Sequence, residues 1–154
     1  VGINGRYASS SISESMKGST FVADVTASYY KGDFNASLGI CNLGPSINYG
    51  AGGYKLPSLA RAGAAYSIAG LTASLEADCF FSGAFNAALG LEYNLSGIAF
   101  LRAGYHYGNN SNTLPSFASA GLGIKLSGFE LNAAYLFGSE SLGSTMMFGL
   151  GYSF

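Results

Sequence analysis

Charge is scarce in this sequence. Asp, Glu, Lys and Arg together make up 10% of its 154 residues, whereas about a quarter of the residues are charged in ordinary soluble domains. A soluble surface needs more charge than this. The net charge is only -1 and there is no run of basic residues, which argues against a nucleic-acid partner.

Long apolar runs are also missing. The longest uncharged stretch, residues 34–54, is interrupted by glycine and proline and is rich in Asn and Ser. A membrane-spanning helix needs about 20 consecutive, mostly apolar residues, so the sequence argues against spanning by helices. The chain begins with Val1, and no charged and apolar leader precedes its first predicted strand. We therefore expect that a signal peptide has been removed or that the chain is a fragment.

Residues for catalysis or metal binding are few. His106 is the only histidine, so a Ser-His-Asp triad would need it, oriented by Asp24 or Asp78; we favour a polar side chain near the external rim. One histidine and two separated cysteines give no metal-ligand spacing. We predict that Cys41 and Cys79 lie on opposite faces of different strands and stay free thiols. No catalytic residue, metal or cofactor is predicted.

What the sequence does contain is alternation. Apolar residues recur at every second position in about ten segments, with small or polar residues between them, which indicates β-strands. The last segment places Met146, Phe148, Leu150, Tyr152 and Phe154 in one apolar row. Such a row on a soluble edge strand would invite aggregation, whereas a transmembrane barrel turns it toward lipid.

We therefore predict one domain, residues 1–154, with an all-β fold: a transmembrane antiparallel up-and-down β-barrel with about ten strands in this chain. Short turns are expected on the periplasmic side and longer loops outside. The predicted short turns are residues 31–32, 69–70, 96–97 and 127–128, and the predicted outer connections are 9–20, 42–57, 82–83, 108–116 and 138–143.

Charge supports this assignment of faces. The charged residues inside the predicted strands all fall on the inward face, although the faces were assigned from apolar residues: Arg6, Asp24, Arg61, Glu76, Asp78, Glu92, Arg102, Lys125 and Glu130.

Turn lengths set the register between neighbouring strands. They predict three lumenal ion pairs, namely Arg61 with Asp78, Glu92 with Arg102, and Lys125 with Glu130. Each would contribute about 0.2–1 kcal/mol and would neutralise charge in a confined interior. This structural role is favoured over paired catalytic carboxylates at Glu76 and Asp78.

Aromatic residues gather near both predicted ends of the strands, where interface girdles explain them; a sugar-binding platform is the alternative. Tyr152 and Phe154 at the carboxyl end are predicted to be an assembly signal, read by the barrel-assembly machinery.

Several ordered segments resemble the C-terminal portion of the PorV/PorQ family of Bacteroidota outer-membrane proteins, which is similar to FadL-type fatty-acid transporters. The segments are Val1-Gly-Ile-Asn-Gly-Arg-Tyr7, Ala23-Asp24, Asn42-Leu-Gly-Pro45, Leu56-Pro57, Arg61-Ala-Gly-Ala-Ala-Tyr66, Gly90-Leu-Glu-Tyr93, Leu101-Arg-Ala-Gly-Tyr105 and Gly121-Leu-Gly-Ile124. The resemblance implies a fourteen-stranded barrel that serves type IX secretion. Either this chain is part of such a barrel, or its ten strands close by themselves.

The leading prediction for function is a non-enzymatic barrel in the outer membrane of a Gram-negative bacterium, acting in type IX secretion or surface protein assembly. Its expected partners are membrane lipid, the barrel-assembly machinery and other envelope or secretion-system proteins. The alternative is a FadL-like transport barrel or porin for small or apolar solutes. An enzyme that uses Asp78 or His106 at the rim is the third hypothesis.

Overall fold

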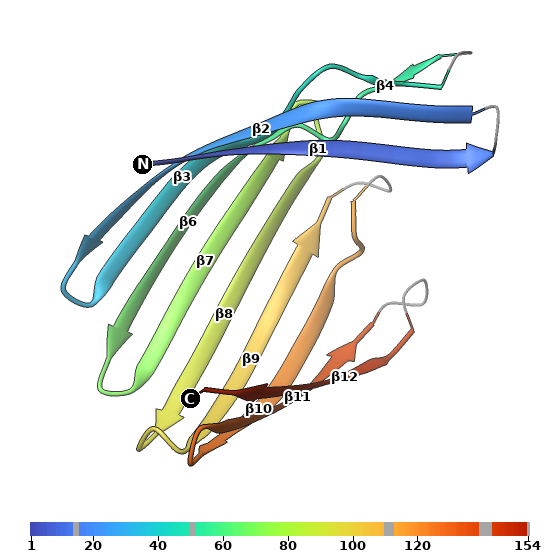
Figure 1. Cartoon of the computed structure of the whole chain (residues 1–154). Helices are drawn as coiled ribbons and strands as arrows, with labels where there is room; N and C mark the ends of the chain where they lie inside the picture. Colours follow the sequence, from blue (N-terminus) through green and yellow to red (C-terminus); the bar gives the residue numbers. More distant parts are fainter. Residues whose placement is uncertain (14–15, 50–51, 110–112, 139–142, 154) are drawn as a thin grey trace.

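The computed structural model (Figure 1) describes residues 1–13, 16–49, 52–109, 113–138 and 143–153. Within these ranges the chain forms strands, turns and loops without any helix. No helix that could cross a membrane is therefore found among the described residues.

Ten of the strands form one antiparallel sheet. In chain order the strands are β1 (Gly2–Ser13), β2 (Met16–Lys31), β3 (Phe34–Leu43), β4 (Ile47–Asn48), β5 (Gly53–Tyr54), β6 (Leu59–Ile68), β7 (Leu71–Phe80), β8 (Phe85–Leu95), β9 (Ala99–Gly108), β10 (Phe117–Leu126), β11 (Phe129–Phe137) and β12 (Thr145–Tyr152). The large sheet has the order β1-β2-β3-β6-β7-β8-β9-β10-β11-β12, and β4 pairs with β5 in a separate hairpin. The predicted ten-stranded up-and-down arrangement is confirmed.

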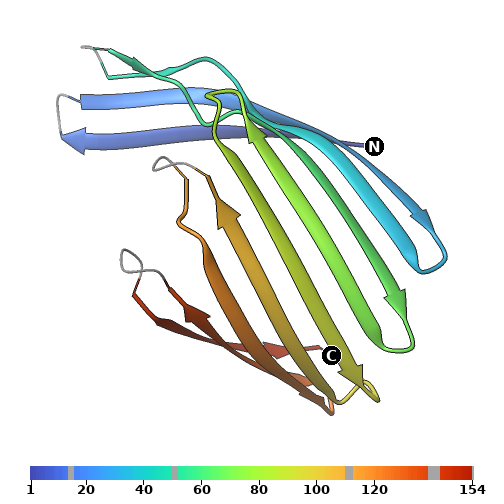
Figure 2. The ribbon, with the colours of Figure 1, turned by 180° about the vertical axis from the view of Figure 1, so that it is seen from behind.

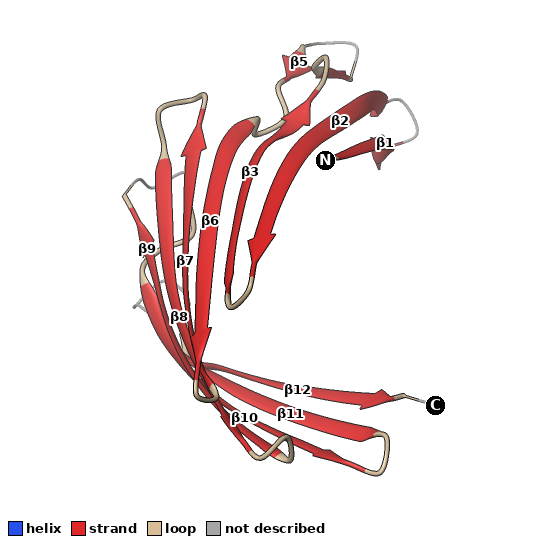
Figure 3. Cartoon of the chain, turned by 90° about the vertical axis from the view of Figure 1, so that its left-hand side faces the viewer, coloured by secondary structure: helices blue, strands red, loops and turns tan. Residues whose placement is uncertain are grey.

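The large sheet is curved and open. Figure 3 shows its strands along an arc with β1 near one end and β12 at the other. In the described part of the chain, β1 pairs only with β2, and β12 pairs only with β11. The tight turns lie at one end of the sheet, opposite to the end where β1 stops and β2 begins and opposite to β4 (Figures 1 and 2).

The register gives the sheet two chemically different faces. Leu122 lies opposite Leu101 and Ala133, whereas its neighbour Gly121 lies opposite Arg102 and Ala134. We call the side of Leu122 the apolar face and the side of Gly121 the polar face. Every second residue along a strand belongs to the same face. The nine charged strand residues predicted to face inward all have the parity of the polar face. Lys17 and Lys31 of β2 have the other parity and lie toward the two ends of that strand.

Exposure is inverted relative to a soluble protein. Among the described residues only three hydrophobic side chains are buried, those of Val22, Leu59 and Ala84. On the apolar face, by contrast, Ile3 is 79% exposed and Phe148 is 77% exposed. Soluble monomers rarely expose continuous apolar surface on this scale, and the described part of the chain leaves the apolar face uncovered.

The turns agree with the predicted register in three places and differ in two. The turns at 69–70 and 127–128 have two residues, and the connection at 96–98 has three, as predicted. Because Lys31 pairs with Phe34, the first turn consists of Gly32 and Asp33, one residue later than predicted. The connection predicted at 82–83 spans residues 81–84.

The predicted outer loop at 9–20 is wrong. β1 continues to Ser13 and β2 begins at Met16, so these residues extend the hairpin beyond the neighbouring strands. The apolar alternation ends near Ala8, but ladder hydrogen bonds come from the backbone and do not need apolar side chains. The predicted loop at 42–57 contains the short hairpin of β4 and β5, which was not predicted. Parts of the predicted loops at 108–116 and 138–143 lie outside the described residues.

The turn after β6 has an unfavourable residue. Ala69 has φ of 48° and Gly70 has φ of 84°, the pattern of a type I′ turn, in which Asn-Gly is preferred. Left-handed backbone costs an ordinary L-residue roughly 1–2 kcal/mol, and asparagine tolerates it better. We therefore expect Ala69→Asn to raise the free energy of unfolding by about 0.5–1 kcal/mol, measured by urea titration of the refolded protein. Gly70→Ala should act in the opposite direction, because a Cβ there would lie 2.9 Å from the carbonyl oxygen of Asn94. Equal stability of the two variants would contradict the turn assignment.

Candidate functional site: the polar face of the sheet

The polar face carries three clusters of charged and amide side chains. We name them the Arg61 cluster (Arg61, Glu76 and Asp78), the Arg102 cluster (Glu92, Arg102, Glu130 and Asn132) and the Arg6 cluster (Arg6, Asp24 and Asn42). Each joins residues of two or three different strands.

In the Arg61 cluster the guanidinium holds two carboxylates. Arg61 Nε lies 2.7 Å from Asp78 Oδ1, and its Nη2 lies 2.8 Å from Oδ2, which makes the pair bidentate. Arg61 Nε is also 3.6 Å from Glu76 Oε1. Asp78 is only 7% exposed. The two-residue turn at 69–70 sets this register, because it places Arg61 directly opposite Asp78.

The Arg102 cluster reaches across an intervening strand. Arg102 Nε lies 2.7 Å from Glu92 Oε2, and its Nη1 donates a hydrogen bond to Asn132 Oδ1. Asn132 in turn donates to Glu130 Oε1 at 2.9 Å. A Cβ at Gly123 of β10, between these strands, would lie 2.8 Å from Asn132 Oδ1. The glycine therefore provides the space through which β9 and β11 are linked.

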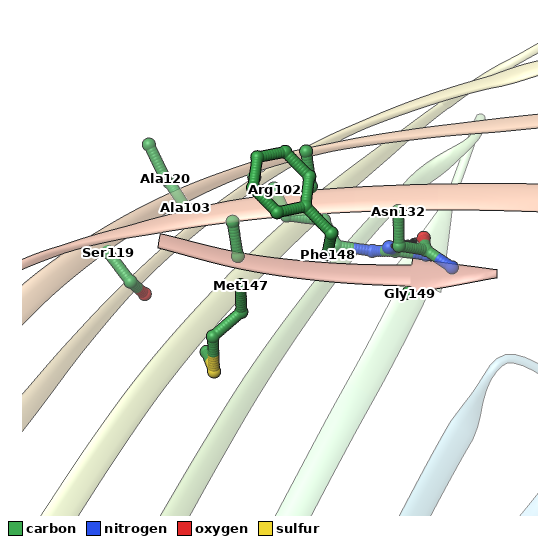
Figure 4. Close-up of a pocket in the computed structure, with 11 residues that line it drawn as sticks. Arg102, Ala103, Ser119, Ala120, Asn132, Met147, Phe148 and Gly149 are labelled. Atoms are coloured by element: carbon green, nitrogen blue, oxygen red, sulfur yellow. Dashed lines mark hydrogen bonds between the residues drawn. The ribbon is translucent and has the colours of Figure 1, made fainter. Parts of the chain in front are cut away.

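A hollow lies next to this cluster, beside the edge strand β12 (Figure 4). It is lined on the polar face by side chains that include Arg102, Ser119, Asn132 and Met147. Figure 4 shows Ser119 and Met147 pointing to one side of the sheet, and Ala120 and Phe148 pointing to the other. The two faces are thus distinct even at the edge strand β12.

The third predicted ion pair, Lys125 with Glu130, is confirmed in its register only. Lys125 lies opposite Glu130, as predicted, yet among the described ion pairs none joins these two side chains. Glu130 instead accepts the hydrogen bond from Asn132. Asn132 was not predicted as this link, although its parity and its register opposite Gly123 follow from the turn at 127–128.

The Arg6 cluster was not predicted as a unit. Arg6 Nη2 donates to Asp24 Oδ1 at 3.0 Å and to Asn42 Oδ1 at 2.8 Å. Asp24 Oδ1 also accepts the backbone N–H of Asn42 at 2.8 Å. The sequence placed Arg6 and Asp24 on the same face. It did not place them together, because a loop was predicted where the β1–β2 ladder continues.

His106 lies on the polar face against an aromatic ring. Its ring stacks on that of Phe117 at 5.0 Å between centroids. His106, Asn86, Glu76 and Asp78 line one small cavity. Within the described part of the chain, His106 Nε2 and Asn86 Oδ1 are buried without a hydrogen-bond partner. The carboxylate of Asp78 is bound by Arg61, and none of the hydrogen bonds among the described residues joins it to His106.

We expect His106→Phe to leave the free energy of unfolding unchanged or to raise it by up to about 1 kcal/mol. An unpaired buried polar atom is unfavourable, and phenylalanine keeps the stack on Phe117. The measurement is the urea midpoint of the refolded variant, compared with that of His106→Ala, which loses the stack. A marked loss of stability in His106→Phe would show that the imidazole nitrogen has a partner.

The remaining predicted residues are placed as follows. Tyr152 of the assembly signal lies on the apolar face, with its ring 4.7 Å from that of Phe129, and Phe154 lies outside the described residues. Cys41 and Cys79 are free thiols, the first on the polar face and the second on the apolar face. No group of three His, Cys, Asp or Glu that could hold a metal ion occurs among the described residues.

No family model matches the chain, and no curated protein matches it.

Proposed function

We propose that this chain forms the wall of an outer-membrane β-barrel, with its apolar face against lipid and its polar face toward the inside. The observation that supports this proposal is the pattern of exposure, which is inverted relative to that of a soluble protein. Large apolar side chains such as Ile3 and Phe148 are more than three-quarters exposed (79% and 77%), while Asp78, an ionisable group, is among the few buried residues. Outer-membrane barrels place residues in this way.

The apolar face has the dimensions of a membrane belt. On β8 the apolar row runs from Phe85 to Leu95, which is about 34 Å along a strand at roughly 3.4 Å per residue. A strand tilt of about 40° reduces this to about 26 Å along the membrane normal, near the roughly 25 Å of an outer-membrane belt. The aromatic residues at both ends of the row fit the interface girdles of such barrels.

Lipid also sets a requirement for the two edge strands. Backbone N–H and C=O groups must be paired within the bilayer, so an open sheet edge is not tolerated there. Because the ten strands alternate in direction, β1 and β12 run antiparallel to each other. They can pair directly, or through any even number of further strands, without a parallel pair. Both the ten-stranded and the fourteen-stranded barrel meet this condition.

The role that we propose for the barrel is non-enzymatic, in type IX secretion or surface protein assembly, as the resemblance to PorV/PorQ proteins implies. The long β1–β2 hairpin and the β4–β5 hairpin support it. They stand together at the end away from the tight turns (Figure 2) and offer a surface to other envelope proteins. The second candidate is transport, which the charged clusters on the polar face favour, because such residues suit a water-filled interior.

Two measurements on the full chain separate these roles. In planar bilayers, a defined conductance without any stoichiometric partner would support transport. Cross-linking in the native envelope followed by purification would support assembly if it yields a stoichiometric envelope protein while the barrel conducts little. Failure of the refolded chain to enter lipid vesicles would contradict both roles.

A further inference from the structure

We propose that Arg6, Asp24 and Asn42 form a clamp that fixes residues 42–49 and 52–58 across the polar face at its outer end, where these two arms narrow the entrance. The clamp is inferred from contacts within the chain. The narrowing rests in addition on the proposed function, because it takes the polar face to line the interior of a barrel.

The clamp is built on a β-bulge. Ala23 pairs with Leu43, but Val25 pairs with Ile40, so two residues of β3 oppose the single residue Asp24 of β2. Asn42, the second of them, has φ of 58°. Its backbone N–H is bound by Asp24 Oδ1 at 2.8 Å. A bulge of this kind redirects the strand that contains it, and here β3 ends at Leu43, one residue after Asn42.

Arg6 ties the bulge to the edge strand. Its guanidinium bridges the carboxylate of Asp24 and the side-chain oxygen of Asn42, at 3.0 and 2.8 Å. Asn4, also on β1, donates to Asp24 Oδ2 at 3.3 Å. The carboxylate thus receives bonds from β1 and β3 together, and charge-assisted hydrogen bonds of this type are stronger than neutral ones.

Asn42 also holds the returning arm. Its Nδ2 donates to the carbonyl oxygen of Pro57 at 3.0 Å, and its own carbonyl oxygen accepts a bond from Ser58 Oγ at 2.7 Å. The outgoing arm starts at Asn42, and the returning arm meets it again at Pro57 and Ser58. One asparagine therefore pins both ends of the excursion.

Contacts with β2 show which face the outgoing arm covers. Thr20 Oγ1 donates to the carbonyl oxygen of Pro45 at 2.8 Å, and a Cβ on Gly18 would lie 2.5 Å from Ile47 Cγ2. Thr20 and Val22, which have the parity of the polar face, are buried, whereas Phe21 on the apolar face is 71% exposed. The outgoing arm therefore lies over the polar face of β2, and Gly18 leaves the space that it occupies, while Asn42 holds the returning arm beside it.

The test uses Asn42→Gly, which keeps a residue suited to positive φ and removes only the amide side chain. The matched control is Asn35→Gly, on the polar face near the other end of β3. Lys55 is exposed on the returning arm, so trypsin cleavage after Lys55 reports release of that arm. In detergent micelles we expect Asn42→Gly to raise the cleavage rate roughly tenfold, since it removes the bonds to Arg6 and Pro57, and Asn35→Gly to leave it unchanged. Equal cleavage in Asn42→Gly and the wild type would overturn the clamp.

A second measurement tests the narrowing by itself. In planar bilayers, Asn42→Gly should conduct more than the wild type and Asn35→Gly should not. Faster cleavage at Lys55 with unchanged conductance would overturn the narrowing while leaving the clamp.

Asp24→Ala, which removes the carboxylate instead of the amide, should reproduce both effects. If it has neither effect, although circular dichroism shows it folded, the assignment of Asp24 to the clamp is wrong. Proteolysis in micelles needs no membrane function, so its result stands even if the proposed function fails.

Discussion

Replacing Phe148 with arginine is expected to lower the free energy of unfolding in lipid by about 2–4 kcal/mol, the penalty for arginine at the middle of the lipid-facing belt of a barrel. Phe148 lies on the apolar face, opposite Ala133 near the middle of β11, and it is 77% exposed. Its neighbour Met147 points to the other face (Figure 4). Met147→Arg is therefore the matched control, and we expect it to change stability by less than about 1 kcal/mol, because substitutions toward the interior mainly alter selectivity.

The measurement is reversible unfolding of both variants in lipid vesicles, followed by the shift between folded and unfolded bands on a gel. The two substitutions introduce the same side chain at adjacent positions of one strand, so a difference between them reports the face alone. Equal destabilisation by both arginines would contradict the assignment of the apolar face to lipid.

Arg61→Ala is expected to lower the free energy of unfolding by about 2–3 kcal/mol. It removes the bidentate partner of Asp78 and leaves a buried carboxylate unpaired, and breaking a fully buried pair costs about 3–5 kcal/mol. The expected value lies below that range because the side chain of Arg61 is 44% exposed. Replacing both residues, as in Arg61→Ala with Asp78→Ala, should recover part of the loss, since no charge is then left unpaired.

Lys125→Ala is the control for this cation, because Lys125 has the register of an ion pair without its contact among the described residues. We expect it to change stability by no more than about 0.5 kcal/mol. The measurement compares the urea midpoints of the wild type, Arg61→Ala, the double variant and Lys125→Ala. Equally small losses in the free energy of unfolding for Arg61→Ala and Lys125→Ala would show that the Arg61 cluster does not stabilise the fold.

The sequence predicted those features that depend on local patterns. Alternation along each segment predicted the strands and their faces, because side chains on a strand have a period of two. Short turns predicted the register that pairs Arg61 with Asp78 and Glu92 with Arg102, because a turn of known length leaves one register that keeps both apolar rows on one face.

Features that depend on distant contacts were not predicted. The bulge at Asn42 shifts the register within β3, and no local pattern marks it. Asn132 joins Arg102 across the intervening strand β10, and the register between β9 and β10 could not be predicted because no short turn joins these two strands. The extension of β1 and β2 was missed because its serines and threonines form a backbone ladder without an apolar row.

The central claim is that the two faces of this sheet meet different media, and labelling along β8 tests it most directly. Single cysteines at Asn86, Ala87, Ala88 and Leu89, in a background with Cys41 and Cys79 replaced by alanine, would carry spin labels in the vesicle-embedded protein. Ala87 and Leu89 lie on the apolar face, and Asn86 and Ala88 on the polar face. The proposal predicts alternation: oxygen, which dissolves in lipid, relaxes the labels at Ala87 and Leu89, and a water-soluble nickel complex relaxes those at Asn86 and Ala88. Preferential relaxation of the Ala87 and Leu89 labels by the nickel complex, or the absence of any alternation, would contradict it.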